Sequence, residues 1–317
     1  MNNRHKRFLA GLYQYIERLV KNAINNDKQF IIWGYARGGA FIKYLLENED
    51  ARAQVAYIID DKMDIVINGT PKIYRSTVFD YIDNSKYILL STILDFEAVE
   101  KRVSEYGYVK GVNLFNTRKD IGVSYVDYLQ LNNNCGLDFS NTTQLDYPEI
   151  YTETDNYIST PFDTISVDKV FERVSLLEEE VYFFDYGCGK GQILFDAYIN
   201  GINHLSGIEL VPSIAHQAWN NLEELGISAD IYEGNAMDFT EIDQYNVFYF
   251  FNPFGGNVFR KVINNIENSI KNNPRRVHII YMNPTCHKMV IENSVFRLDK
   301  QLYVACGDPL ANFYVAD

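Results

Sequence analysis

Two stretches of the chain repeat one pattern of apolar and polar positions. Each reads as an apolar strand, a glycine-rich turn, an amphipathic helix and a second apolar strand that ends in an acidic residue. The first stretch covers residues 29–60 and ends at Asp60, and the second covers residues 181–209 and ends at Glu209. Such units build parallel sheets that bind ligands at the carboxyl ends of their strands. The pattern therefore predicts two tandem α/β domains.

The first domain is expected to be Rossmann-like and to span residues 1–120. After the first unit, the pattern predicts a strand over 86–92, a helix over 95–107 and a short apolar segment over 109–115. An amphipathic helix precedes them, because apolar residues recur at helical spacing. These residues are Phe8, Leu12, Ile16, Leu19 and Ile24. We expect this helix to pack on its own domain or on a sister subunit, with membrane attachment as the alternative.

Residues 121–156 are rich in Asn, Tyr and Asp and have weak periodicity, which predicts a linker with a short helix over 124–131. The second domain then spans residues 157–317 and begins with a helix over 163–178. Helices and strands alternate through it until the tail, where 295–307 and 310–317 read as an antiparallel hairpin. The order predicts a sheet of seven strands.

Composition excludes several classes of function. The chain has 317 residues, a formal net charge of -13 and a pI near 4.9, which argues against a nucleic-acid partner. Its cysteines are scattered without a Cys-x-x-Cys pair, which favours reduced thiols over disulfides or a metal site. No signal peptide or membrane-spanning run is recognisable. We therefore expect a cytoplasmic enzyme without a metal. Assembly of the chain into a homo-oligomer is compatible with the sequence.

The second glycine turn carries the strongest chemical signal. Asp185, Gly187, Gly189 and Gly191 form D-x-G-x-G-x-G directly after an apolar strand. An acid at this point repels a phosphate and favours a ligand with a cationic end, as in S-adenosylmethionine, which has an ammonium and a sulfonium. Glu209 is spaced to bind the ribose hydroxyls. The next loop offers residues to the adenine, namely Asn235, Ala236 and Asp238. A nicotinamide or another nucleotide is the alternative ligand.

Residues 157–317 resemble the class I S-adenosylmethionine-dependent methyltransferases. The segments YISTPFDTI, DYGCGKGQILFDA and GIEL are similar to those of the non-SET histone-lysine methyltransferases and their bacterial relatives. The resemblance implies a seven-stranded methyltransferase sheet. It also implies that Thr160 and its loop cover the methionine end of the cofactor.

The segment FFNPFGG, residues 250–256, is expected to lie at the transferable methyl group. Methyl transfer is an in-line displacement, so the main task of the protein is to align a nucleophile. Asn252 and the carbonyl of Pro253 are predicted to accept hydrogen bonds from an amine, while Phe254 packs on the acceptor. A purely structural turn is the alternative.

Three further residues near strand ends have weaker signals. Asn283 and Pro284 follow the next strand, and His287 is either a general base or a hydrogen-bonded structural residue. Cys188 is expected to be a small buried filler.

The first glycine turn predicts a possible second ligand site at Gly34, Arg37, Gly39 and Asp60. Ala36 replaces the second glycine of a dinucleotide turn, and its methyl group would crowd a pyrophosphate. The stretch IIDDKMDIVINGTPKI resembles the Rossmann-like N-terminal domains of bacterial sugar-tailoring enzymes. This resemblance implies a nucleotide-linked sugar as the ligand. The alternative is a domain that keeps the fold without a ligand.

Taken together, the sequence predicts methyl transfer from S-adenosylmethionine to a small molecule, a nucleotide sugar or a glycan precursor. Three alternatives stay open: protein-lysine N-methylation, a non-catalytic cofactor-binding scaffold, and an oxidoreductase that uses the first glycine turn.

Overall fold

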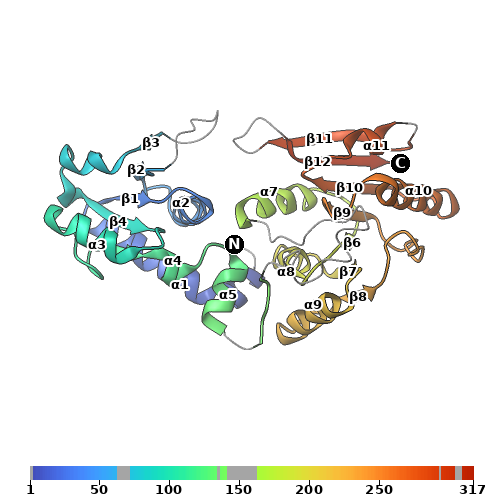
Figure 1. Cartoon of the computed structure of the whole chain (residues 1–317), viewed down its shortest axis with the longest axis horizontal. Helices are drawn as coiled ribbons and strands as arrows, with labels where there is room; N and C mark the ends of the chain where they lie inside the picture. Colours follow the sequence, from blue (N-terminus) through green and yellow to red (C-terminus); the bar gives the residue numbers. More distant parts are fainter. Residues whose placement is uncertain (1–2, 63–71, 134–135, 141–162, 293, 304–308) are drawn as a thin grey trace. The chain divides into compact units, whose positions relative to one another are not determined.

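The computed structural model describes residues 3–62, 72–133, 136–140, 163–292, 294–303 and 309–317. The chain forms two compact units (Figure 1). The first contains residues 3–132 and 163–165, and the second contains residues 133–162 and 166–317. The first unit thus continues past residue 120 and includes a helix at Tyr125–Asn133, where the sequence predicted a short helix over 124–131 within the linker.

The first unit is built on a parallel sheet of five strands in the order β3-β2-β1-β4-β5. Its strands are β1 (Gln29–Trp33), β2 (Val55–Ile59), β3 (Ile73–Tyr74), β4 (Tyr87–Ser91) and β5 (Leu114–Asn116). Its α-helices are α1 (Asn3–Asn25), α2 (Arg37–Glu49), α3 (Phe96–Val103), α4 (Thr117–Ile121) and α5 (Tyr125–Asn133). Short 3-10 helices span Ser76–Asp80, Asn84–Lys86 and Ser104–Tyr106. The strand order reverses between β1 and β4, the position at which such sheets bind ligands.

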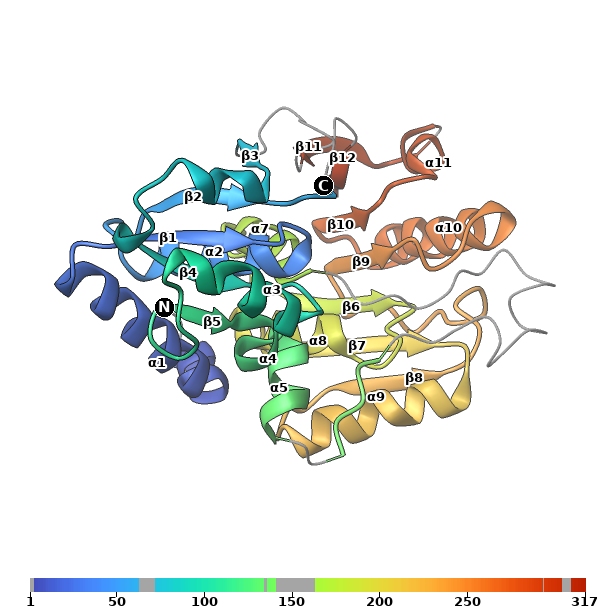
Figure 2. The same cartoon turned by 60° about the vertical axis from the view of Figure 1, so that its left-hand side comes forward.

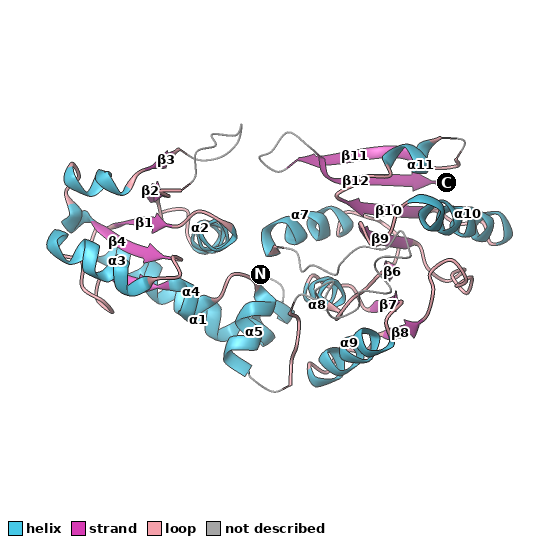
Figure 3. Ribbon diagram, viewed as in Figure 1, coloured by secondary structure: helices cyan, strands magenta, loops and turns pink. Residues whose placement is uncertain are grey.

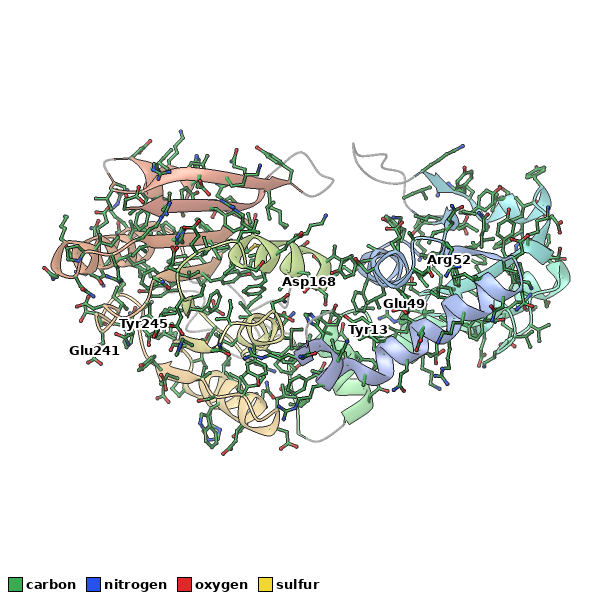
Figure 4. The ribbon with its side chains drawn as sticks, turned by 180° about the vertical axis from the view of Figure 1, so that it is seen from behind. Tyr13, Glu49, Arg52, Asp168, Glu241 and Tyr245 are labelled. Carbon is green, nitrogen blue, oxygen red and sulfur yellow. The ribbon has the colours of Figure 1, made fainter. Side chains whose placement is uncertain are left out.

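Helix α1 buries an apolar face within its own unit. Leu9, Leu12 and Ile16 are fully buried, at the spacing that places them on one side of a helix. The hydroxyl of Tyr13, labelled in Figure 4, lies 3.0 Å from that of Tyr125 on α5. The predicted N-terminal helix is therefore present and packs on its own unit.

The second unit contains a seven-stranded sheet in the order β11-β12-β10-β9-β6-β7-β8 (Figure 2). Its strands are β6 (Tyr182–Tyr186), β7 (His204–Glu209), β8 (Asp230–Glu233), β9 (Val247–Phe251), β10 (Val277–Met282), β11 (Arg297–Tyr303) and β12 (Pro309–Ala316). Strands β6 to β10 pair in parallel, and β12 pairs antiparallel with both β10 and β11. The predicted fold class is confirmed, including the antiparallel hairpin at the end of the chain.

Helices cover both faces of this sheet (Figure 3). They are α7 (Thr164–Val174), α8 (Gln192–Ile199), α9 (Pro212–Glu224), α10 (Gly256–Asn272) and the short α11 (His287–Ile291). Helix α7 ends earlier than the predicted residue 178. In α10, apolar residues recur every three or four positions and are buried, which packs one side of the helix on the sheet.

Aromatic side chains fill the core beneath the strands. The ring of Phe184 on β6 lies 4.7 Å from Tyr245 (labelled in Figure 4) and 5.4 Å from Phe239, between ring centroids. Tyr186 stacks on Phe250 of β9 at 4.9 Å. These contacts hold β6 and β9 side by side, so that their carboxyl ends lie at one edge of the sheet.

Within the described ranges, no helix combines the length and apolar character that a bilayer span needs. The same ranges hold no cluster of three or more His, Cys, Asp or Glu side chains suited to a metal ion.

Candidate cofactor site

The glycine turn after β6 is tied to the neighbouring strand β7. The backbone N–H groups of Gly187 and Cys188 both donate to the carbonyl of Ile208, at 2.9 and 3.0 Å. Gly187, Gly189 and Gly191 have φ angles of 79°, 53° and 85°, a region that favours glycine. The turn therefore needs glycines for its own conformation.

Gly187 also permits a close contact with a second turn. A Cβ atom added there would lie 2.5 Å from the Cβ of Pro253, in the turn after β9. No real side chain could occupy that space. The D-x-G-x-G-x-G turn and the Asn-Pro-Phe turn thus touch at the carboxyl edge of the sheet, as the sequence predicted that both would contribute to one site.

Glu209 joins the glycine turn to the end of β7. Its Oε2 atom accepts a hydrogen bond from the N–H of Gly189 at 3.1 Å, and its Oε1 atom accepts one from Val211 at 3.0 Å. A carboxylate offers about four lone-pair positions, so these backbone donors leave capacity to accept a hydrogen bond from a hydroxyl group. Glu209 can therefore orient the turn and still bind a diol.

The loop after β8 is anchored to the same residue. The N–H of Gly234 donates to the backbone carbonyl of Glu209 at 2.9 Å. The side-chain oxygen of Asn235 accepts from the N–H of Met237 at 3.0 Å, which shapes the loop. Ala236 is buried in the core, while Asn235 and Asp238 are exposed. The loop thus offers the backbone and the exposed side chains of Asn235 and Asp238 to a ligand.

Two carboxyl groups dominate the electrostatics of this edge. Asp185 is 2% exposed on β6, and burial together with the charge of Glu209 raises its pKa well above the ordinary value. Burial also raises the pKa of Glu209, although backbone hydrogen bonds from Val211, Gly189 and Leu210 act in the opposite direction. A ligand with positive charge relieves both effects, since it stabilises ionised carboxylates. The two acids fit the ammonium and ribose of S-adenosylmethionine.

Cys188 is 5% exposed inside the turn. Burial and the nearby carboxyl groups of Asp185 and Glu209 raise the pKa of its thiol well above the usual range. A protonated thiol is a poor nucleophile, so Cys188 fits its expected role as a buried filler.

Asn252 occupies a left-handed conformation with φ of 45° at the end of β9. Its side-chain Oδ1 accepts a hydrogen bond from the hydroxyl of Thr285 at 2.7 Å and a longer one from Tyr281 at 3.5 Å. This backbone conformation costs free energy in a non-glycine residue, and such strain is concentrated at functional sites. Asn283 has the same geometry at the end of β10, with φ of 48°.

Phe254 differs from its expected role. Its side chain is 4% exposed and lies among the rings of Tyr186, Phe250 and Phe259, with centroids 6.2 to 6.4 Å away. The prediction that Phe254 packs on the acceptor is not supported by this placement. Burial of the ring between β6, β9 and α10 accounts for an apolar residue here.

His287 is hydrogen-bonded within the terminal hairpin. Its Nδ1 atom lies 2.8 Å from the hydroxyl of Tyr314 and 3.2 Å from Nδ2 of Asn312. Asn312 is itself buried and receives a hydrogen bond from Gln301 at 2.9 Å. These contacts favour the structural reading of His287 over that of a general base.

A short segment, residues 136–140, holds the glycine turn from outside, and the sequence did not reveal it. Lys190, within the turn, pairs with the carboxylate of Asp138 at 2.6 Å. Asn221 on α9 donates to the backbone carbonyls of Asp138 and Lys190, at 2.8 and 2.9 Å, and accepts from the N–H of Asp138. Asn221 is 1% exposed, so these bonds are shielded from water.

The predicted second site in the first unit is built on a similar turn. The carboxylate of Asp60 accepts from the N–H of Tyr35 at 3.0 Å, and Thr92 donates to the carbonyl of Gly34 at 2.8 Å. A Cβ atom on Gly39 would lie 2.0 Å from that carbonyl, so Gly39 serves the packing of α2 on the turn. Arg37 is the exposed first residue of α2. A ligand here stays a prediction.

Thr160 and the other residues of its loop up to Phe162 lie outside the described residues. Of the remaining predicted cofactor residues, the structure brings together Asp185, the three glycines, Glu209 and the Asn235 loop at the carboxyl ends of β6, β7 and β8. These three strands lie side by side in Figure 2. Asn252 and Pro253 lie at the end of the adjacent β9.

Several solved structures that resemble this chain at low sequence identity are described as methyltransferases. The YhhF protein of Escherichia coli, assigned as a methyltransferase, is 17% identical over 50% of this chain and 88% of that chain, with a TM-score of 0.41. A protein of Haemophilus influenzae assigned as a methylase is 18% identical over 47% of this chain and 86% of its own, with a TM-score of 0.36. An RNA methyltransferase from Salinibacter ruber, solved in complex with S-adenosyl-L-homocysteine, is 17% identical over 50% of this chain and 92% of its own, with a TM-score of 0.35.

No family model and no curated protein matches the chain. At these identities and TM-scores, the likeness identifies neither the reaction nor the acceptor.

Proposed function

We propose that the second unit binds S-adenosylmethionine and transfers its methyl group to an acceptor at the end of β9. One observation carries the proposal. A buried carboxyl group, Asp185, and a partly buried one, Glu209, lie at the ends of adjacent strands beside a turn of three glycines with positive φ. A ligand with a cationic end and a diol complements that arrangement, and a phosphorylated ligand does not.

Each residue then has a defined task. Asp185 binds the cationic end, Glu209 accepts from the ribose hydroxyls, and the backbone of the glycine turn approaches the ligand closely because no side chain intervenes. The loop at Asn235 and Ala236 borders the adenine, and Thr160 is proposed to cover the methionine end. When bound, the cofactor supplies a methyl group already activated by its sulfonium.

Asn252 and Pro253 position the acceptor. Pro253 contacts the glycine turn through Gly187, so the acceptor turn and the cofactor turn keep a fixed spacing. Alignment of this kind supplies much of the rate in a displacement between two bound molecules.

We further propose that the acceptor is a small molecule, a nucleotide sugar or a glycan precursor. The five-stranded parallel sheet of the first unit supports this choice, since its order matches sheets that bind nucleotides at their switch point.

Calorimetric titration with S-adenosylmethionine and S-adenosylhomocysteine tests the cofactor. We expect both to bind the wild-type chain and neither to bind Asp185→Ala. Asp299→Asn is the control, because it also removes one carboxylate. Asp299 pairs with Arg173 and lies on β11, the edge strand opposite to β8. Absence of binding to the wild type would refute the proposal.

Methyl transfer itself is tested with labelled S-adenosylmethionine and a panel of nucleotide sugars. We expect Asn252→Ala to lose turnover while it keeps its affinity for the cofactor. Equal turnover in Asn252→Ala and in the wild type would make the Asn-Pro turn purely structural.

A further inference from the structure

The amide of Asn252 is oriented by its neighbours. Its Oδ1 atom faces the hydroxyl of Thr285, which donates at 2.7 Å, and the hydroxyl of Tyr281 at 3.5 Å. Tyr281 is held in turn, because its oxygen accepts from the N–H of Cys286 at 3.3 Å. Both hydroxyls belong to the end of β10 or to the loop that follows it.

The orientation decides which half of the amide is available to a ligand. A primary amide has one accepting oxygen and one nitrogen with two donor hydrogens. The oxygen is engaged by Thr285, and among the described residues no hydrogen bond is recorded from Nδ2 of Asn252. Asn252 therefore offers donors at the carboxyl edge of β9, and not the acceptor that we expected from the sequence.

Donor groups recognise lone pairs. An ammonium or a neutral amine that points its own hydrogens at Asn252 would meet N–H groups and gain no hydrogen bond. A carboxylate oxygen would accept from Nδ2, and a hydrogen bond with one charged partner is roughly twice as strong as a neutral one. The amide thus selects against an amine acceptor.

Within the described part of the chain, the hydrogen-bond partners of Asn252 include no strong base. The described groups hydrogen-bonded to the side chain of Asn252 are the neutral hydroxyls of Thr285 and Tyr281. Burial, the largest effect, raises the pKa of Tyr281, so its phenol stays protonated near neutral pH. An alcohol acceptor would need to lose a proton to a base, whereas a carboxylate is already ionised because its ordinary pKa is about 4.

We propose that the acceptor atom is a carboxylate oxygen and that the product is a methyl ester. This inference rests on the proposed function. A lone pair of the carboxylate oxygen forms the O–CH₃ bond while the S–CH₃ bond breaks and leaves its electron pair on sulfur. No proton is released, and the positive charge of the sulfonium and the negative charge of the carboxylate are both lost. Asn252 holds the second carboxylate oxygen through Nδ2.

The orientation is tested by nuclear magnetic resonance on the full chain saturated with S-adenosylhomocysteine. The side-chain amide of Asn252 is labelled with ¹⁵N-asparagine and assigned by its absence in Asn252→Asp. Sodium acetate and methylammonium chloride are the two probes, with sodium chloride at equal ionic strength as the reference. We expect acetate to shift the Asn252 NH₂ resonances saturably and methylammonium to leave them at the reference position. A shift with methylammonium alone, or none with acetate, would overturn the proposal.

Two variants test the amide group of Asn252 and the hydroxyl group that orients it one at a time. Asn252→Asp keeps the shape of the side chain but removes both donors, so the shifts that acetate causes in the backbone N–H resonances of residues 252 and 254–256 should disappear. Thr285→Val removes the hydroxyl that fixes Oδ1, so the preference for acetate over methylammonium should fall. An unchanged preference in Thr285→Val would show that Thr285 does not set the orientation and would overturn that step.

Binding of S-adenosylhomocysteine is measured first in every sample. If it fails in the wild type, the proposed cofactor fails. If it succeeds and the acetate response is absent, only the carboxylate inference fails.

Discussion

The buried carboxyl group of Asp185, which we propose binds a cation, is expected to lower the free energy of unfolding. Its pKa is raised by burial and by Glu209, so the folded state holds its proton more tightly than the unfolded state. Protonation of Asp185 therefore stabilises the folded state. This contribution to the free energy of unfolding is complete below the unfolded-state pKa of about 3.9, and it is lost as pH rises through the folded-state pKa. We predict that Asp185→Asn unfolds at a higher temperature than the wild type, by a margin that grows with pH. Thermal unfolding between about pH 5 and pH 8 measures this.

The same substitution should weaken binding of S-adenosylmethionine at least about tenfold, or about 1.4 kcal/mol. Glu241→Gln is a suitable control because Glu241 (Figure 4) is an exposed acid in the segment after the β8 loop. A variant that is both less stable and fully able to bind would contradict this account of Asp185.

A substitution at Gly187 tests the steric contact with Pro253. Alanine there must adopt φ near 79° and place its Cβ against Pro253. The conformation alone costs about 1–2 kcal/mol, and displacement of Pro253 adds to it. We predict that Gly187→Ala loses more free energy of unfolding in urea than Gly111→Ala, and also loses cofactor binding.

Gly111 is the matched glycine, with φ of 77° and no heavy atom within 4 Å of an added Cβ in the described structure. Equal losses in the two variants would mean that the contact with Pro253 is unimportant.

At the scale of elements, the segment 136–140 and helix α9 should act together on the glycine turn. Asn221→Ala removes the partner of the Asp138 and Lys190 carbonyls and of the Asp138 N–H. Each buried polar group left without a partner costs about 1–3 kcal/mol. Because three such groups lose their partner, we predict a loss of at least about 3 kcal/mol in the free energy of unfolding and weaker binding of S-adenosylmethionine.

Asn220→Ala on the same helix is the control, since its side chain contacts only His216 among the described hydrogen bonds. If Asn221→Ala kept the cofactor affinity of Asn220→Ala, the segment would have no role in shaping the turn.

Local patterns predicted the elements well, but they did not predict contacts outside the ends of the parallel strands. Apolar runs such as VFYFF on β9 and the period of α10 are visible because side-chain direction follows the backbone. The pairing of Asp138 with Lys190 joins residues that are far apart in the chain, so no local pattern encodes it. Insertion of β12 between β10 and β11 is equally a matter of tertiary packing.

The candidate site shows the same division. Spacing located Asp185 and Glu209, because strand ends of a parallel sheet meet at one edge. It failed for Phe254, since an aromatic residue after a strand suits both the core and a ligand pocket. The direction of the Asn252 amide depends on Thr285, which follows a different strand, and no sequence spacing reveals it.

At the scale of the whole molecule, both units share one hydrogen-bonding arrangement. In each, the acid at or just after the end of the second strand accepts a backbone N–H from the turn after the first strand: Asp60 from Tyr35, and Glu209 from Gly189. The turns differ in charge at the first strand, where the second unit has the buried Asp185 and the first has Ile32 at the matching place before its glycine. This difference predicts that only the second turn binds a cationic ligand.

The most direct test is equilibrium titration of S-adenosylmethionine into the full chain as wild type, Asp185→Asn and Asp60→Asn. The account predicts binding to the wild type and to Asp60→Asn with similar affinity, and at least about tenfold weaker binding to Asp185→Asn. Loss of binding in Asp60→Asn with retention in Asp185→Asn, or no binding to the wild type, would contradict it.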